Sequence, residues 1–175
     1  MKPIKLLMIG LAFTALLGSC ATIPKGATAV EPFDVNKYLG QWYEIARFDF
    51  KFERGLNNTT ANYSLNPNST VKVLNRGYDY TANVWKEAIG KAKQITEGKA
   101  MLKVSFFGPF YAGYNVLALD SEYKYALVSG KNLDYLWILS RETTIPEDIK
   151  SDYLNLANNL GFDTSRFVWV EHNAK

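Results

Sequence analysis

The chain has almost no cysteine and almost no histidine, with one of each among its 175 residues. A single Cys cannot form a disulfide within the chain, and a single His cannot supply a histidine-rich zinc site. The sequence also lacks a Gly-x-Ser-x-Gly nucleophile motif and a P-loop. These absences exclude most metal-dependent and nucleophilic chemistry, so we expect no metal, no cofactor and no catalytic residue.

An excess of charge of one sign is also missing. The chain has 20 Lys and Arg against 17 Asp and Glu, and Lys2 and Lys5 belong to the first 19 residues, which have the pattern of a leader. The rest of the chain is nearly neutral, whereas proteins that bind nucleic acids need a basic surface. We therefore expect no nucleic-acid partner.

No apolar run reaches the roughly 20 residues that a helix needs to cross a bilayer. A run over residues 6–17 follows two lysines and ends in two small residues before Cys20. This layout is typical of a secretory signal peptide. The alternative is an N-terminal core helix.

The segment Leu17-Gly18-Ser19-Cys20 resembles the lipobox of bacterial lipoproteins, in which the Cys carries acyl chains such as palmitate and becomes the first residue. Two or more chains anchor a protein stably, whereas a single chain gives marginal binding. The residue after Cys20 is Ala21 and not the Asp of inner-membrane lipoproteins, so the resemblance implies a lipid anchor in the outer membrane, facing the periplasm. We expect a signal peptide over 1–19, a lipidated Cys with a linker over 20–32, and one domain over 33–175.

Most of this domain alternates apolar and polar residues with a period of two, which predicts strands with one buried face. Short links between them make sequence neighbours antiparallel, and a closed barrel hides the edges. We therefore predict an all-β fold: an eight-stranded antiparallel up-and-down β-barrel. One amphipathic C-terminal helix over 146–160 packs outside it, and a last strand follows over 166–171. The predicted barrel strands are 42–49, 59–65, 70–78, 84–95, 101–107, 111–119, 123–129 and 135–141.

Gly40-Gln41-Trp42 at the start of the first strand resembles the Gly-x-Trp motif of the lipocalins. In that family the Trp plugs the closed end of the barrel, and a basic residue from the last strand packs across it. Arg141 stands at the matching place, where its guanidinium can form a cation-π contact with the Trp42 indole. The second family motif, usually Thr-Asp-Tyr, is altered here, because Ser121 follows Asp120. Further segments between Phe33 and Val170 are similar to the lipoprotein lipocalins of bacterial outer membranes.

The resemblance implies a container whose function depends on the side chains that line its interior, the lumen. We assign the Trp137 face of the last strand to the lumen because Arg141, on the same face, has to reach Trp42. Tyr111 shares a face with Asn115 on the sixth strand, and a head group could bind its hydroxyl. The alternative is that these aromatic residues only fill the core. The predicted ligand-binding residues are Ala46, Phe48, Leu102, Val104, Phe106, Tyr111, Asn115, Tyr135, Trp137 and Leu139.

Charged residues near the barrel mouth each have two possible roles. Arg47, Lys51 and Arg54 gather around the loop 50–58, where they either attract an anionic head group or form an ordinary solvated loop. Glu44 shares the face of Trp42, and it lies either near the lumen floor or as a surface or ion-paired residue.

The family resemblance implies a non-enzymatic protein that binds fatty acids or lysophospholipids, and stores or transports them for membrane biogenesis or maintenance under stress. Burial of each acyl methylene contributes about 0.8 kcal/mol, so such a ligand needs no dedicated charge. Two alternatives are a lipocalin-type enzyme acting on a lipophilic substrate and an envelope interaction protein with a filled barrel. Whether two barrels pair as a homodimer is left open.

Overall fold

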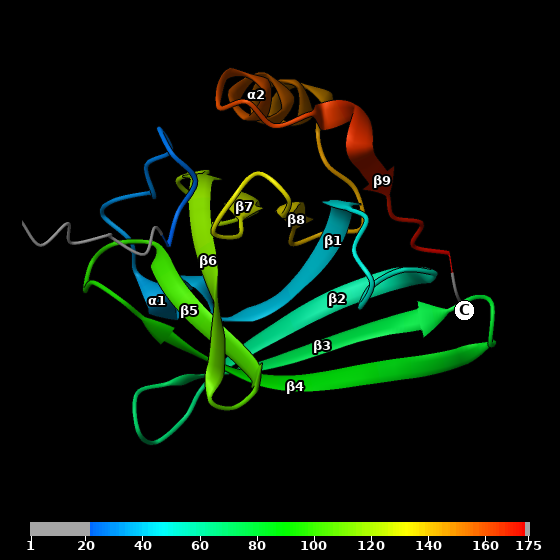
Figure 1. Ribbon diagram of the computed structural model, residues 1–175, viewed down its shortest axis with the longest axis horizontal. Coiled ribbons are helices and arrows are strands. Elements are labelled where there is room, and N and C mark those ends of the chain that lie inside the picture. Colours follow the sequence, from blue (N-terminus) through cyan, green and yellow to red (C-terminus); the bar gives the residue numbers. More distant parts are fainter. Residues whose placement is uncertain (1–21, 174–175) are drawn as a thin grey trace, which may run out of the picture.

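Eight strands form one closed antiparallel barrel in the computed structural model, which describes residues 22–173 (Figure 1). The barrel strands are β1 (Gly40–Phe48), β2 (Leu56–Leu65), β3 (Val71–Asp79), β4 (Val84–Gln94), β5 (Met101–Phe107), β6 (Phe110–Leu119), β7 (Tyr125–Ser129) and β8 (Leu136–Ser140). A short ninth strand, β9 (Phe167–Trp169), pairs with β1. Sequence neighbours pair from β2 to β8, and β1 closes the barrel between β8 and β2. The predicted fold class is confirmed, whereas the predicted signal peptide and Cys20 lie outside the described residues.

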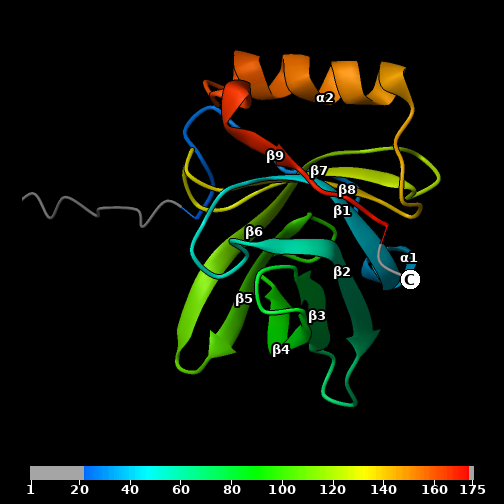
Figure 2. The ribbon, with the colours of Figure 1, turned by 90° about the vertical axis from the view of Figure 1, so that its right-hand side faces the viewer.

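One long helix, α2 (Glu147–Asn159), packs on the outside of the barrel over β1, β7 and β8 (Figure 2). Pro146 precedes it, and Gly161 follows it with a φ of +88°, a conformation that favours glycine. Tyr153 and Ala157 are its buried residues, and the Tyr153 hydroxyl donates a hydrogen bond of 2.9 Å to the Tyr125 carbonyl. No helix in the described part of the chain is long and apolar enough to cross a membrane.

Two apolar clusters lie on opposite sides of the barrel wall. The inner cluster contains Trp42, Val73 and Leu102 and belongs to the lumen. The outer cluster contains Ile138 and Phe48 and lies beneath α2. Because alternate residues of a strand point to opposite faces, the helix-covered strands contribute to both clusters.

The residues before the barrel form a strap along its outer wall, which we define as residues 22–33. The Val30 amide donates to the Val116 carbonyl at 2.9 Å, and the Val30 carbonyl accepts from the Ala100 amide at 2.9 Å. Ala29 and Phe33 are buried against the barrel. The segment predicted as a linker is therefore packed on the domain, because its small apolar residues and backbone groups find partners there. It leads into a short helix, α1 (Val35–Tyr38), at the closed end.

Candidate ligand-binding cavity

The closed end of the barrel is built around Trp42, which is fully buried. The Arg141 guanidinium carbon lies 3.9 Å from the centroid of the Trp42 ring, and the same guanidinium donates hydrogen bonds to the carbonyls of Gln41 and Lys37. Gly40 has a φ of +94°, and a Cβ there would lie 3.3 Å from an Arg141 nitrogen. The predicted motif residues Gly40, Trp42 and Arg141 thus meet at one end of the barrel.

The barrel interior is hollow, with a cavity of about 840 Å³. This volume lies in the range of about 300–1,000 Å³ that is typical of small-molecule sites. Apolar side chains form most of its wall, among them Val71 and Val73 of β3 and Ala92 of β4. The cavity contradicts the alternative of a barrel filled by its own aromatic residues.

Seven of the ten predicted ligand-binding residues line this cavity. They come from β5, β6 and β8 and from the loop before β8. They are Leu102, Val104, Phe106, Tyr111, Tyr135, Trp137 and Leu139. Their contact with a ligand stays a prediction.

The predicted placement of Ala46 and Phe48 in the lumen is wrong. The register between β1 and β8 shifts between Glu44 and Ala46, which marks a bulge. An extra residue in a strand exchanges its two faces beyond that point. Ala46 and Phe48 therefore join the outer cluster under α2.

Asn115, on β6, was predicted to line the cavity, and it does not. Its side-chain amide donates to the carbonyls of Thr22 and Gly130, at 2.8 Å and 3.0 Å, and so fastens the strap to the loop between β7 and β8. The opposite face of β6 turns inward, where Tyr114 lines the cavity and Val116 joins the inner cluster.

Three tyrosine hydroxyls meet inside the cavity near its closed end. The Tyr114 hydroxyl is 2.8 Å from that of Tyr38 and 3.0 Å from that of Tyr63. Burial raises the pKa of all three phenols above their ordinary value. The floor therefore presents neutral hydroxyl groups beneath apolar walls.

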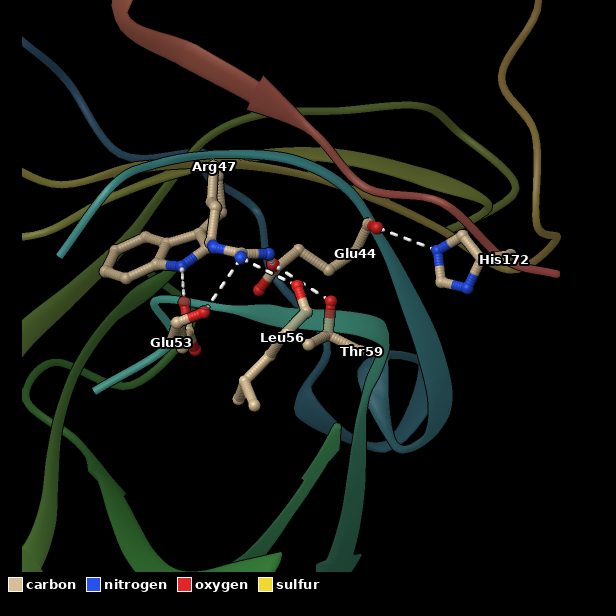
Figure 3. A network of polar contacts seen from close by, with 7 residues as sticks. Glu44, Arg47, Glu53, Leu56, Thr59 and His172 are labelled. Carbon is tan, nitrogen blue, oxygen red and sulfur yellow. Dashed lines mark hydrogen bonds and ion pairs between the residues drawn. The ribbon is translucent and has the colours of Figure 1, made fainter. Parts of the chain in front are cut away.

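A polar cluster lies where β1 and β2 separate (Figure 3). The strands pair over Gly40–Tyr43, and beyond this range the Arg47 side chain points inward, only 2% exposed. Arg47 donates to the Glu44 carboxylate and to the carbonyls of Glu53 and Leu56, each at 2.8 Å. Arg47 is thus a buried clamp, and it is neither a solvated cation nor an exposed attractor of head groups, the two alternatives left open for the first loop.

The Glu44 carboxylate in this cluster also accepts a hydrogen bond of 3.0 Å from the Thr59 hydroxyl. Burial raises the pKa of Glu44, against the lowering effect of the Arg47 guanidinium. Glu44 lines the cavity and is also ion-paired with Arg47, so the structure combines the two alternatives. The sequence analysis missed this role of Arg47, because the bulge that turns Arg47 inward leaves no mark in the pattern of apolar residues of β1.

Glu53 connects this cluster to the cavity mouth. Its carboxylate accepts a hydrogen bond of 3.1 Å from the Trp137 indole. Burial raises the pKa of Glu53 to about 8, and the neighbouring Glu44 charge adds to the shift, while Trp137 and Arg47 oppose it. The Glu53 carboxyl therefore keeps its proton to a higher pH than a carboxyl in water does.

Aromatic side chains extend from this point across the mouth. The Phe50 ring packs edge-on against Tyr135 and Trp137, with centroids 5.8 Å and 5.7 Å apart. Phe52 reaches Phe107 on the opposite side of the mouth, with centroids 6.4 Å apart. The loop between β1 and β2 thus partly covers the cavity.

A family model described as a lipocalin-like domain matches residues 33–172, which include the hollow barrel, its closed end and α2. This chain is a lipocalin. The lipocalin is 52% identical over 161 residues to the outer membrane lipoprotein Blc of Escherichia coli K12, a match that covers 91% of each chain. It is 46% identical over 162 residues to the protein of that name in Vibrio cholerae, covering 90% of this chain and 94% of the relative. These names agree with the lipid-anchored outer-membrane location predicted from the leader.

More distant relatives share the same architecture. Rat apolipoprotein D is 41% identical over 143 residues, covering 75% of this lipocalin and 71% of the relative. The structure of insecticyanin from Manduca sexta superposes with a TM-score of 0.70 at 20% identity, covering 86% of each chain. This last similarity shows the fold alone.

Within residues 22–173, the lipocalin has no group of three or more His, Cys, Asp and Glu side chains that could hold a metal ion. His172 uses its ring for structure: Nε2 is 2.9 Å from the Glu44 carbonyl, and the ring packs edge-on against Tyr43. The arrangement as a whole can hold an elongated apolar molecule with polar contacts at the floor and at the mouth.

Proposed function

We propose that this lipocalin binds fatty acids or lysophospholipids in its barrel and stores or carries them for membrane biogenesis or maintenance under stress. A lipid anchor on Cys20 attaches it to the outer membrane, on the periplasmic side. The observation that carries the proposal is the cavity of about 840 Å³ with predominantly apolar walls.

The cavity suits an acyl chain for two reasons. Leu102 and Val104 of β5 and Val73 of β3 offer apolar surface to the cavity, and each buried methylene contributes about 0.8 kcal/mol. Polar groups gather at the tyrosine floor and around Glu53, and Asn75, Arg76, Lys86 and Glu87 of β3 and β4 add further polar groups to the wall. Apolar walls with such polar contacts fit an amphiphile, in keeping with lipocalins, which are generally binding proteins.

Two neighbouring residues of β5 provide the test. Val104 faces the cavity, whereas Lys103 is exposed on the outer face of the same strand. We expect Val104→Trp to occupy the space of several methylenes and to weaken binding by at least about tenfold. Lys103→Trp adds the same side chain outside, and we expect no change in affinity.

Calorimetric titration of the delipidated protein with palmitate and with lysophosphatidylethanolamine measures both variants against the unchanged chain. An unchanged chain that binds neither lipid would overturn the proposal. Equal affinities of the Val104→Trp variant and the unchanged chain would place the ligand outside this cavity.

A further inference from the structure

Three phenylalanines stand exposed at the open end of the barrel. Phe52, Phe107 and Phe110 are 65%, 70% and 78% exposed, and all three border the cavity. Phe107 pairs with Phe110 at the hairpin between β5 and β6, and the Phe52 ring lies beside Phe107. Contiguous exposed apolar surface on a soluble domain marks a contact site. We call these three residues the mouth rim.

Three lysines surround the mouth rim. Lys51, Lys103 and Lys131 are exposed, and none forms an ion pair with another residue in the range 22–173. Lys51 Nζ lies 4.7 Å from the Phe52 ring centroid, and Lys103 Nζ lies 5.4 Å from that of Tyr111.

The acidic residues nearby do not cancel this charge. Asp49 is paired with Arg54 and Glu87 with Arg76, and Glu53 is half-buried with a raised pKa, which leaves Asp134 in the loop between β7 and β8. The phenylalanines of the mouth rim, surrounded by lysines, match the layers of a membrane surface: the apolar side chains match the acyl chains, and the lysines match the anionic phosphates above them.

The strap fixes the place where the N-terminal tether leaves the domain. The Thr22 carbonyl accepts from Asn115, and a Cβ at Gly113 would lie 2.5 Å from the same oxygen. Gly113 is three strand residues from Phe110 at the hairpin, about 10 Å. Figure 2 shows this first described segment, in blue, beside the yellow loop that joins β7 to β8. The tether therefore starts on the mouth half of the barrel.

The short tether restricts how the domain can sit on the bilayer. Cys20 precedes Thr22 by two residues, which span at most about 7 Å. A free linker over 20–32 would instead have left the barrel from Phe33, near the closed end, and would have allowed any orientation. A strap that is bonded along the wall holds the mouth half close to the acylated residue.

We infer that the mouth rim rests in the membrane leaflet that holds the lipid anchor, with the three lysines at the phosphate level, so that the cavity opens directly to the lipids. The inference rests on the proposed lipidation of Cys20. It assigns the open end as a membrane-docking surface and implies that a ligand passes between the bilayer and the barrel without crossing bulk water.

Depth-dependent quenching tests the orientation. The lipidated full-length protein is prepared with a single added cysteine, either Phe110→Cys at the mouth or Glu97→Cys on the exposed turn between β4 and β5 at the closed end. Each is labelled with an environment-sensitive dye, because the acylated Cys20 does not react. The proteins are reconstituted in vesicles of phosphatidylethanolamine and phosphatidylglycerol that contain acyl-spin-labelled phospholipid. We expect strong quenching at position 110 and almost none at position 97.

Charge reversal tests the role of the lysines. In the protein labelled at position 110, Lys103→Glu should lower the ratio of docked to undocked mouth by about tenfold, and Lys72→Glu, on β3 near the closed end, should leave it unchanged. Replacing phosphatidylglycerol by phosphatidylcholine should abolish the difference between the two variants. Equal effects of the two reversals would overturn the assignment of the lysines.

Equal quenching at positions 110 and 97, or stronger quenching at 97, would overturn the orientation. So would a label at position 110 that is protected from the lipid quencher and transfers energy to a second copy, since a protein partner would then cover the mouth. Neither measurement uses a ligand. Failure to bind palmitate therefore overturns the proposed cargo alone, and mass spectrometry of the N-terminal peptide decides the lipidation of Cys20 separately.

Discussion

The Glu53 carboxyl ties the loop between β1 and β2 to the barrel wall. It accepts a hydrogen bond from the Trp137 indole, while the Glu53 backbone carbonyl accepts one from Arg47. Burial raises its pKa from 4.5 to about 8. Between these two pH values the folded chain keeps a proton that the unfolded chain has lost, so the stabilisation present below pH 4.5 is lost as the pH rises through 8.

Glu53→Gln removes this titration and keeps an oxygen that can accept from Trp137. We expect the melting temperature of the unchanged chain to fall, relative to that of the variant, between pH 5 and pH 8.5, by about 2–4 °C for each kcal/mol of linkage. Thermal unfolding followed by circular dichroism at both pH values measures the difference. Glu97→Gln, on an exposed turn, is the control, and its melting temperature should change with pH as that of the unchanged chain does. If the melting temperature of Glu53→Gln changed with pH as that of the unchanged chain does, Glu53 would not be the cause of the pH dependence.

Strand alternation predicted the lumen residues of β5 and β8 but failed on β1 and at Asn115 of β6. On β8, Trp137 and Leu139 face the cavity because the strand is regular. On β1 the bulge beyond Glu44 reverses the faces, and a bulge leaves no mark in the pattern of apolar residues, because both faces of β1 are buried. On β6 the strap covers the outer face, so Asn115 is buried without facing the lumen. Counting by twos could not reveal either feature.

Two substitutions distinguish the roles of the outer and the inner face of the barrel wall. Phe48→Ala removes an aromatic ring from the cluster under α2, and we expect a loss of about 3–5 kcal/mol in unfolding free energy with unchanged affinity for palmitate. Leu102→Ala removes part of the cavity wall and should weaken palmitate binding as well as stability. Urea unfolding and calorimetric titration, at a temperature where both variants are folded, separate the two effects. Weaker palmitate binding by the Phe48→Ala variant would contradict the placement of Phe48 on the outer face.

The whole molecule combines a hollow interior with a solid outer core. The cluster under α2 joins β1, β7 and β8 to Tyr153 and Ala157 without involving the cavity. This arrangement lets the barrel keep its shape while part of the inner wall lacks packing partners. Apolar walls around an empty space lose dispersion contacts, which a ligand can restore.

A ligand that fills this cavity should therefore stabilise the folded barrel by mass action, since the unfolded chain has no cavity. At a free palmitate concentration of a hundred times Kd, the gain is about 2.7 kcal/mol, which raises the melting temperature of a domain of this size by about 5–10 °C. Thermal unfolding across a series of palmitate concentrations measures the shift, which should grow with the logarithm of concentration. Val104→Trp should lose most of it, because the indole occupies the space that the acyl chain needs, and Lys103→Trp should keep it. A shift of equal size in both variants would mean that the lipid stabilises the protein from its surface.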